Sequence, residues 1–392
     1  MQRVERYIII GDKNLDSLCF LSKNLYNYVN YLIRQEFTQS GKMLSEYEVT
    51  TRLAKEKQAD YIVLPSQTSQ QIVKLLFKNW KSFFKLCKCK GKLKGKPKLP
   101  KYKHKTKGRN IVVFTSQQCK LKDGYIHFPK KANIQPLRTK VTNLCQVRII
   151  PQCSCHIIEV VYEKECIKTI GLEPDSYLSI DLGLNNLVTS CDSLNHKSFI
   201  VNGRPLKSIN QYFNKKRALL MSYIGNRGTS NRIGKLTLKR NCKVNDYMHK
   251  ASRFIVNYCI EHHIGTIVIG NNKDWKQNCN MGKRNNQNFV SVPFEKLISM
   301  IQYKSEEVGI RVVITEESYT SKVDHYAGEE MCHHDSYLGK RIKRGLYRSS
   351  TGKILNADLN GAIGILRKVS HESYMQVVSR GGVETPSRIH LV

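Results

Sequence analysis

The sequence predicts an α/β fold joined to a β-barrel-like domain, and three observations favour this fold class. Short apolar segments typical of strands occur at residues 5–11 and again over 110–166, where Asp123-Gly124 marks a two-residue hairpin turn. Between them, residues 18–84 carry apolar side chains at helical spacing. From residue 177 onward, three strand-like segments are followed by helices and strands in alternation.

Composition limits the class of protein and its partners. The chain has 392 residues, of which 40% are hydrophobic, so it can form real cores. Lys and Arg number 65 against 31 Asp and Glu, which gives a net charge of +34 and indicates nucleic acid as the partner. No apolar run is long enough to cross a membrane, and the N-terminus has no signal-peptide core. We therefore expect no membrane partner. The chain has 13 cysteines, an odd number, so we expect reduced thiols and a cytoplasmic location.

The N-terminal helices are expected to form a small bundle inserted between strands. One helix begins near Leu18, a second spans about 45–57, and a third follows Ser66, which we expect to be its N-cap. The apolar stripe of the third helix, which includes Trp80, is typical of core packing. The predicted boundaries are therefore residues 1–11 and 110–170 for the barrel domain and residues 12–109 for the helical domain.

A strongly basic segment follows these helices. Residues 81–109 contain 12 Lys and one Arg with no acidic residue, and prolines and glycines in this segment prevent a continuous helix. One interpretation is a solvated charge run. The other is a strap along a phosphate backbone, with a tyrosine available for stacking and contacts from Lys92, Lys94, Lys96, Lys98 and Tyr102.

The second half of the chain has the element order of an RNase H-like domain. Three strands are expected at 177–181, 186–191 and 197–202, followed by a long basic helical region at 206–262. A strand at 266–270, a helix at 293–308 and a strand at 311–318 come next. An irregular insertion at 322–353 then precedes a last helix at 357–368. We place this domain at residues 171–369 and treat residues 370–392 as a tail.

Two aspartates are candidate metal ligands. Asp181 ends an apolar strand and precedes a glycine, and Asp358 lies in the first turn of the last helix. Either alone fits a turn residue or a helix N-terminal charge. Together they fit a two-metal nuclease, which needs several carboxylates around its divalent ions. Hard oxygen ligands favour Mg²⁺, for which Mn²⁺ can substitute.

Several segments resemble TnpB (OrfB-type) proteins of insertion sequences, which are relatives of type V CRISPR effectors. They read IDLGLNNLVTS, NMGKRNNQNFV, ESYTSK, GKRIKRG and NADLNGAIGI. The resemblance implies a RuvC-like nuclease domain, a wedge-type β-barrel and an inserted helical recognition domain. It also implies a Mg²⁺-dependent, RNA-guided endonuclease of the bacterial nucleoid that cuts double-stranded DNA next to a short flanking motif, with one chain or two on each guide RNA.

Three other functions stay open. The chain could be a nuclease-dead, RNA-guided DNA-binding repressor, or a CRISPR-associated type V effector with the same chemistry. An unguided RNase H-like nuclease is the third alternative, although such an enzyme gives no function to the helical bundle or the basic segment.

The sequence departs from the resembled family at the third carboxylate. The family usually has a Glu after the fourth strand of the nuclease domain, where this chain has Gly270. The nearest acid downstream is Asp274, in a loop. We expect Glu317, after the fifth strand, to supply the carboxylate, with its neighbour Glu316 as the alternative. The catalytic and metal-binding set is then Asp181, Glu317 and Asp358.

A second departure concerns zinc. Relatives commonly carry a four-cysteine zinc ribbon in the insertion, whereas this chain has only Cys332, with His325, His333 and His334 nearby. Their spacing is poor for zinc, so no structural zinc is expected. The insertion instead carries a basic lid for phosphate, made of Lys340, Arg341, Lys343 and Arg344.

Further nucleic-acid contacts are expected from the long basic helical region. Its candidates are Lys215, Lys216, Arg217, Lys239, Arg240 and Arg253. They would follow a guide–target heteroduplex, although a merely solvated face explains them equally well. The resembled family adds Trp80 to the expected contacts. Asn185 and Asn360 are candidates for orienting the two aspartates or a water.

Overall fold

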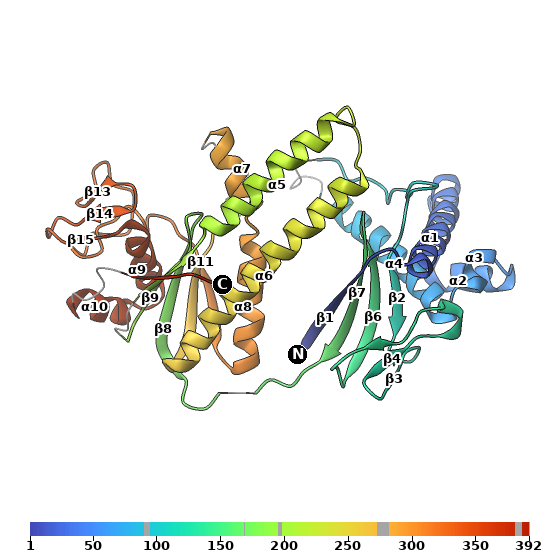
Figure 1. Cartoon of the computed structure of the whole chain (residues 1–392), viewed down its shortest axis with the longest axis horizontal. Helices are drawn as coiled ribbons and strands as arrows, with labels where there is room; N and C mark the ends of the chain where they lie inside the picture. The colour runs from blue at the N-terminus through green and yellow to red at the C-terminus, as the bar shows by residue number, and fades with distance from the viewer. Residues whose placement is uncertain (90–94, 168, 195–197, 273–281, 381–385, 392) are drawn as a thin grey trace. The chain divides into compact units, whose positions relative to one another are not determined.

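The computed structural model describes residues 1–89, 95–167, 169–194, 198–272, 282–380 and 386–391 (Figure 1). The chain divides into two compact units, residues 1–164 and 165–392. Within the described ranges, no helix has both the length and the apolar character needed to cross a membrane.

The first unit contains two antiparallel sheets. The larger has the order β1 (Gln2–Ile9), β7 (His156–Glu163), β6 (Leu144–Pro151) and β2 (Val112–Thr115), and the smaller joins β3 (Lys120–Lys122), β4 (Tyr125–His127) and β5 (Leu137–Arg138). The predicted Asp123-Gly124 turn is confirmed, since both residues have the positive φ values of a tight hairpin. The expected closed barrel is not found in the described part of the unit, because β1 and β2 form the open edges of the larger sheet.

Four helices precede β2 and share their core with the sheet. They are α1 (Lys13–Ser40), α2 (Glu46–Lys55), α3 (Ala59–Val63) and α4 (Ser66–Lys88). Ser45 and Glu48 form a capping box at the start of α2. The expectation that Ser66 caps α4 was wrong by one residue, since Ser66 is already helical and follows Pro65. Buried side chains of α1, α4 and the strands form one continuous hydrophobic cluster, so helices and sheet stabilise each other.

The second unit is built on a six-stranded sheet. Its order is β12 (Arg311–Thr315), β11 (Ile264–Gly270), β8 (Glu173–Leu182), β9 (Asn186–Asp192), β10 (Phe199–Asn202) and β16 (Ser387–Ile389). Strands β8, β9 and β10 are antiparallel neighbours, while β11 and β12 run parallel to β8. This is the RNase H-like arrangement expected from the element order. Strand β16 pairs with β10, so the predicted tail completes the sheet.

Helices cover both faces of this sheet. Side chains of α6 (Asn231–Glu261) and α8 (Phe294–Val308) pack against one set of alternating strand residues, and α9 (Ala357–Val369) packs with α10 (His371–Arg380) against the other set. Helices α5 (Arg204–Ser222) and α7 (Lys283–Ser291) lie farther out, as Figure 1 shows. The sheet edge near the start of α9 is where the candidate carboxylates meet.

The insertion before α9 folds into a small three-stranded sheet of β13 (Lys340–Lys343), β14 (Leu346–Arg348) and β15 (Ile354–Asn356). The fully buried Asp324 connects the segment before this sheet to the turn between β14 and β15. The Asp324 carboxylate accepts hydrogen bonds from the Ser349 hydroxyl and from the backbone N–H and hydroxyl of Ser350, at 2.6–2.9 Å. Glu329 accepts in turn from the backbone N–H of Asp324 at 2.7 Å. Charge-assisted hydrogen bonds of this kind are strong, so they stabilise the position of the β13–β14 hairpin.

Candidate active site

Three neighbouring strands bring their ends to one edge of the six-stranded sheet. Ile180 in β8 lies opposite Ile269 in the parallel strand β11, and Gly270 lies opposite Thr315 in β12. Asp181 is therefore level with Gly270, and the residues that follow β12 emerge beside both. Carboxyl ends of parallel strands are where α/β folds place their ligands.

Glu317 fills the space above Gly270. A Cβ atom at position 270 would lie 2.6 Å from Cγ and 2.7 Å from Oε1 of Glu317, distances at which real atoms do not coexist. The backbone of Glu317 is fixed by Asn272, whose side-chain oxygen accepts its N–H at 2.9 Å. Glu316 is exposed and accepts a hydrogen bond from Ser318, so of the two candidates Glu317 is the one directed at the sheet. The loop residue Asp274 lies outside the described residues.

Asp358 reaches the same edge from the first turn of α9. Asn356 caps this helix and accepts the backbone N–H of Asp358 at 2.9 Å. Close packing of α9 on β8 depends on Gly361, where a Cβ would lie 2.9 Å from Oδ2 of Asp181. The helix and the strand thus bring Asp358 and Asp181 to the same part of the site.

An asparagine that we did not predict orients Asp358. Asn186 is buried in β9 and donates from Nδ2 to Oδ2 of Asp358 at 2.7 Å. Its predicted neighbour Asn185 instead accepts from the Lys207 ammonium, and Asn360 donates to the Val323 carbonyl, so neither contacts an aspartate. The pair Asn185-Asn186 near Asp181 indicated in the sequence that an asparagine could orient a carboxylate. Only the position of Asn186 in β9 shows that this residue, and not Asn185, faces Asp358.

The electrostatics of the site are those of crowded carboxylates. Burial raises the pKa of Asp181 well above its ordinary value, and the charges of Glu317 and Asp358 raise it further, while Arg341 lowers it. Burial also raises the pKa of Glu317 to about 7, partly opposed by Lys368. Oε1 of Glu317 is buried and has no hydrogen-bond partner. Such a cluster would be stabilised by a cation.

The chemical type of these groups fits a hard divalent cation. Within the described ranges, no group of three His, Cys, Asp or Glu side chains stands close enough, as placed, to hold a metal ion. However, the three carboxylates supply oxygen donors of the type that Mg²⁺ prefers, and the unpartnered Oε1 of Glu317 is available to one.

Of the candidate zinc residues of the insertion, Cys332 and His334 contact each other, while His325 and His333 make other contacts. Sγ of Cys332 lies 3.3 Å from Nε2 of His334, and His333 stacks edge-on against Tyr319. His325 is fully buried, with Nε2 2.8 Å from the Thr320 carbonyl oxygen and against α9 at Gly364.

Most of the predicted nucleic-acid contacts are exposed. Those with free access to solvent are Lys96, Lys98, Tyr102, Lys215, Lys216, Arg217, Lys239, Arg253, Lys340, Arg341, Lys343 and Arg344. The predicted contacts Lys92 and Lys94 lie outside the described residues. Arg341 is also the basic residue whose charge acts on Asp181.

Two predicted nucleic-acid contacts are corrected by the structure. Trp80 is 0% exposed, donates from its indole N–H to Asn30 and packs among phenylalanines, because it belongs to the core of the first unit. Arg240 donates to the side-chain oxygen of Asn210 at 2.8 Å and to the Ser291 carbonyl at 2.7 Å. Its guanidinium therefore joins α6 to α5 and to the end of α7.

Comparisons with known proteins match two parts of the chain to family models. Residues 159–276 match OrfB_IS605, described as a probable transposase, and residues 294–365 match the Cas12f1-like TNB domain. A curated relative is the TnpB-like protein ORF457 of Acidianus two-tailed virus, 26% identical over 415 aligned positions that cover 91% of this chain and 83% of the relative.

Solved structures also match at low similarity. The Cas12f1–sgRNA–target DNA complex is 14% identical, with 93% of this chain and 98% of the other covered and a TM-score of 0.40. The mini RNA-guided endonuclease Cas_phi3 is 11% identical, with 94% and 92% covered and a TM-score of 0.42.

The two family models fall on the segments that carry the carboxylates. Asp181 lies in the first matched range, and Glu317 and Asp358 lie in the second. The matched curated relative covers nearly the whole chain. The chain is therefore similar to TnpB-type proteins over most of its length.

Proposed function

We propose that this chain is an RNA-guided DNA endonuclease whose active site consists of Asp181, Glu317 and Asp358. The observation that carries the proposal is the position of Glu317, whose carboxylate lies over Gly270 at the sheet edge that also holds Asp181. In this proposal residues 171–369 are the RuvC-like nuclease domain. Residues 12–109 are the recognition domain, and residues 1–11 with 110–170 are the wedge-type domain, formed by open sheets.

The three carboxylates would hold Mg²⁺, which when bound activates water and stabilises the leaving 3′-oxygen of a phosphodiester. The residues of the chain prepare the site for this. Asn186 occupies one oxygen of Asp358 and fixes the rotation of its carboxylate. Gly361 lets α9 approach Asp181 closely. Arg341, whose charge already acts on Asp181, is placed to neutralise the phosphate of a bound strand.

Guide RNA and double-stranded DNA are the proposed partners. A net charge of +34 and the exposed basic residues of α5, α6 and the β13–β14 hairpin supply sequence-independent attraction to phosphates. Base pairing between guide and target would then read the sequence, and the protein would read a short flanking motif.

The guided part of the proposal is tested by the RNA that copurifies with the protein. The chain is expressed together with its native flanking DNA, and the bound RNA is sequenced. We expect one dominant structured species with a variable end. A broad mixture of host fragments would instead favour an unguided nuclease.

The catalytic part is tested on a plasmid that carries the matching target, with the purified complex and Mg²⁺. Asp181→Ala and Glu317→Gln should abolish cutting while target binding is retained, because each removes a negative charge from the proposed metal site and leaves the basic residues that bind nucleic acid unchanged. Glu316→Gln is the matched control and should cut normally, since Glu316 is exposed beside Ser318. Loss of cutting in Glu316→Gln with normal cutting in Glu317→Gln would overturn the assignment. Target binding without cutting by the wild-type complex would make the chain a repressor.

A further inference from the structure

Helix α5 presents two tyrosines to solvent on one face. Tyr212 is 61% exposed and Tyr223, at the end of the helix, is 72% exposed. Eleven residues correspond to about three helical turns, so both rings lie on the same side. Lys216 is exposed between them, and the sequence from 193 to 245 contains no acidic residue. Basic residues interleaved with exposed aromatic rings are typical of surfaces that bind unpaired nucleic-acid strands.

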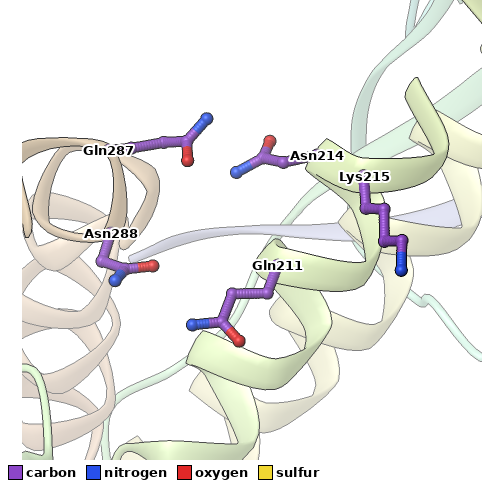
Figure 2. A pocket seen from close by; sticks show the side chains of 5 residues that line it. All are labelled: Gln211, Asn214, Lys215, Gln287 and Asn288. Atoms are coloured by element: carbon purple, nitrogen blue, oxygen red, sulfur yellow. The ribbon is translucent and has the colours of Figure 1, made fainter. Parts of the chain in front are cut away.

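A polar pocket lies beside this tyrosine face, between α5 and α7. Figure 2 shows the side chains of Gln211 and Asn214 from α5 opposite those of Gln287 and Asn288 from α7, while Lys215 extends from α5 away from α7. The volume is about 390 Å³, within the range of small-ligand sites. Four of the five lining side chains are carboxamides, and none is a carboxylate.

The chemistry of the lining suits a nucleotide. Each carboxamide has one oxygen that accepts and one NH₂ group that donates hydrogen bonds. The Watson–Crick edge of an unpaired base also mixes donors and acceptors, and it is free only when the base has no pairing partner. Lys215 lies three residues from Tyr212, so its ammonium can pair with a phosphate between a base in the pocket and a base on the tyrosine face.

We propose that the α5–α7 pocket and the tyrosine face bind an unpaired nucleic-acid strand, with one base in the pocket and bases farther along the same strand stacked on Tyr212 and Tyr223. The site is separate from the carboxylate site. Its tyrosines and carboxamides are not among the residues expected to follow a base-paired heteroduplex, although Lys215 and Lys216 are. A duplex does not fit it, because paired bases expose neither their Watson–Crick edges nor their faces.

Binding without cleavage tests this proposal. The full chain, freed of nucleic acid at high salt, is titrated in EDTA with fluorescein-labelled 20-mers of single-stranded DNA, single-stranded RNA and double-stranded DNA, and anisotropy is measured. Two double variants are compared with wild type: Tyr212→Ala with Tyr223→Ala, and Gln211→Ala with Gln287→Ala. Each should weaken single-strand binding about tenfold or more and duplex binding less than twofold.

Matched controls separate this effect from a general loss of surface. Tyr47→Ala removes a tyrosine that is 79% exposed on α2, and Gln70→Ala removes an exposed amide on α4; both should bind like wild type. Tyr212→Phe with Tyr223→Phe should also bind normally, because stacking needs the ring and not the hydroxyl. A loss confined to RNA identifies a guide strand as the ligand, and a loss confined to DNA identifies a displaced DNA strand.

Two results would overturn the proposal. One is unchanged single-strand affinity in both double variants. The other is an equal loss for single strands and duplex, which would mean that the surface attracts phosphates without regard to pairing. Because EDTA removes any cleavage step, neither result depends on whether the chain is a nuclease.

Discussion

Gly270 and Glu317 share one position in space. The glutamate comes from the segment after β12, yet its Cγ and Oε1 lie where a side chain on the last residue of β11 would begin. A side chain at 270 would therefore require both Glu317 and Ile365, whose Cδ1 would lie 2.5 Å from its Cβ, to move. The Glu317 carboxylate therefore lies close to where a carboxylate on residue 270 would lie.

Moving the carboxylate to position 270 tests this overlap. Gly270→Glu alone should lose cutting and destabilise the second unit by roughly 1–3 kcal/mol, since its Cβ would overlap Glu317 and Cδ1 of Ile365. Gly270→Glu combined with Glu317→Ala should recover part of the stability and part of the cutting, because only the overlap with Ile365 remains. Thermal unfolding and plasmid cleavage measure the two effects. Glu317→Ala alone serves as the control and should stay inactive; equal activity of the single and double variants would show that position 270 cannot replace 317.

Asn186 should matter through Asp358. Asn186→Ala removes the donor to Oδ2 of Asp358, so the carboxylate rotates freely and cutting should fall about 10- to 100-fold, with more Mg²⁺ needed for half-maximal rate. Asn185→Ala is the matched control, because Asn185 contacts Lys207. Direct Mn²⁺ titration of the protein without nucleic acid gives a second readout. A lower rate with unchanged metal affinity would mean that Asn186 acts elsewhere.

The sequence predicted the second unit well because its strands carry local signals. Short apolar runs located β8 to β12 and helix α8. The single helical region expected at 206–262 divides into α5 and α6, and α7 was not predicted. That Glu317 supplies the third carboxylate stays a prediction, which its position over Gly270 supports. Strand alternation cannot decide between Glu316 and Glu317, because both follow β12, which ends at Thr315.

Features set by long-range pairing were not predicted. Strand β16 has three residues and pairs only with β10, so nothing in its local sequence marks it as part of the sheet. The prediction of a closed barrel was wrong for the same reason. The alternation of apolar and polar residues along a strand does not show whether its outer edge pairs with another strand. Trp80 lies in a stripe typical of core packing, and the family resemblance pointed away from that simpler interpretation.

Replacing Trp80 should affect stability and not nucleic-acid contact. Trp80→Ala leaves a large cavity among Phe37 and Phe84 and removes the donor to Asn30, so the first unit should lose about 3–5 kcal/mol. Thermal unfolding measures this loss. At a temperature where the variant is still folded, its affinity for RNA should equal that of wild type. Lys98→Ala is the converse control, with normal stability and a smaller dependence of binding on salt.

The stability of the second unit should fall in mild acid because of His325. Burial lowers the pKa of this histidine to about 4, although the Thr320 carbonyl opposes the shift; Arg367 also lowers it, and Asp324 and Glu329 raise it. The unfolded chain, with an ordinary pKa near 6.5, binds a proton between these values while the folded chain does not. The contribution of the neutral His325 ring to the free energy of unfolding is therefore fully present above pH 6.5 and is lost as the pH falls toward 4. Between pH 7 and pH 5 the expected loss is about 2 kcal/mol.

Amide hydrogen exchange in α9 at pH 7 and pH 5, corrected for the intrinsic rate, follows this change in the unit that contains His325. His325→Gln should be less stable than wild type at pH 7, because the ring packs against Gly364 and the Gln side chain cannot fill its place, but its stability should depend less on pH. His333→Gln, at an exposed histidine of the same insertion, should keep the wild-type pH dependence. If His325→Gln loses as much protection as wild type on acidification, the acid sensitivity comes from other groups, and His325 is protonated in the folded protein at a higher pH than its burial predicts.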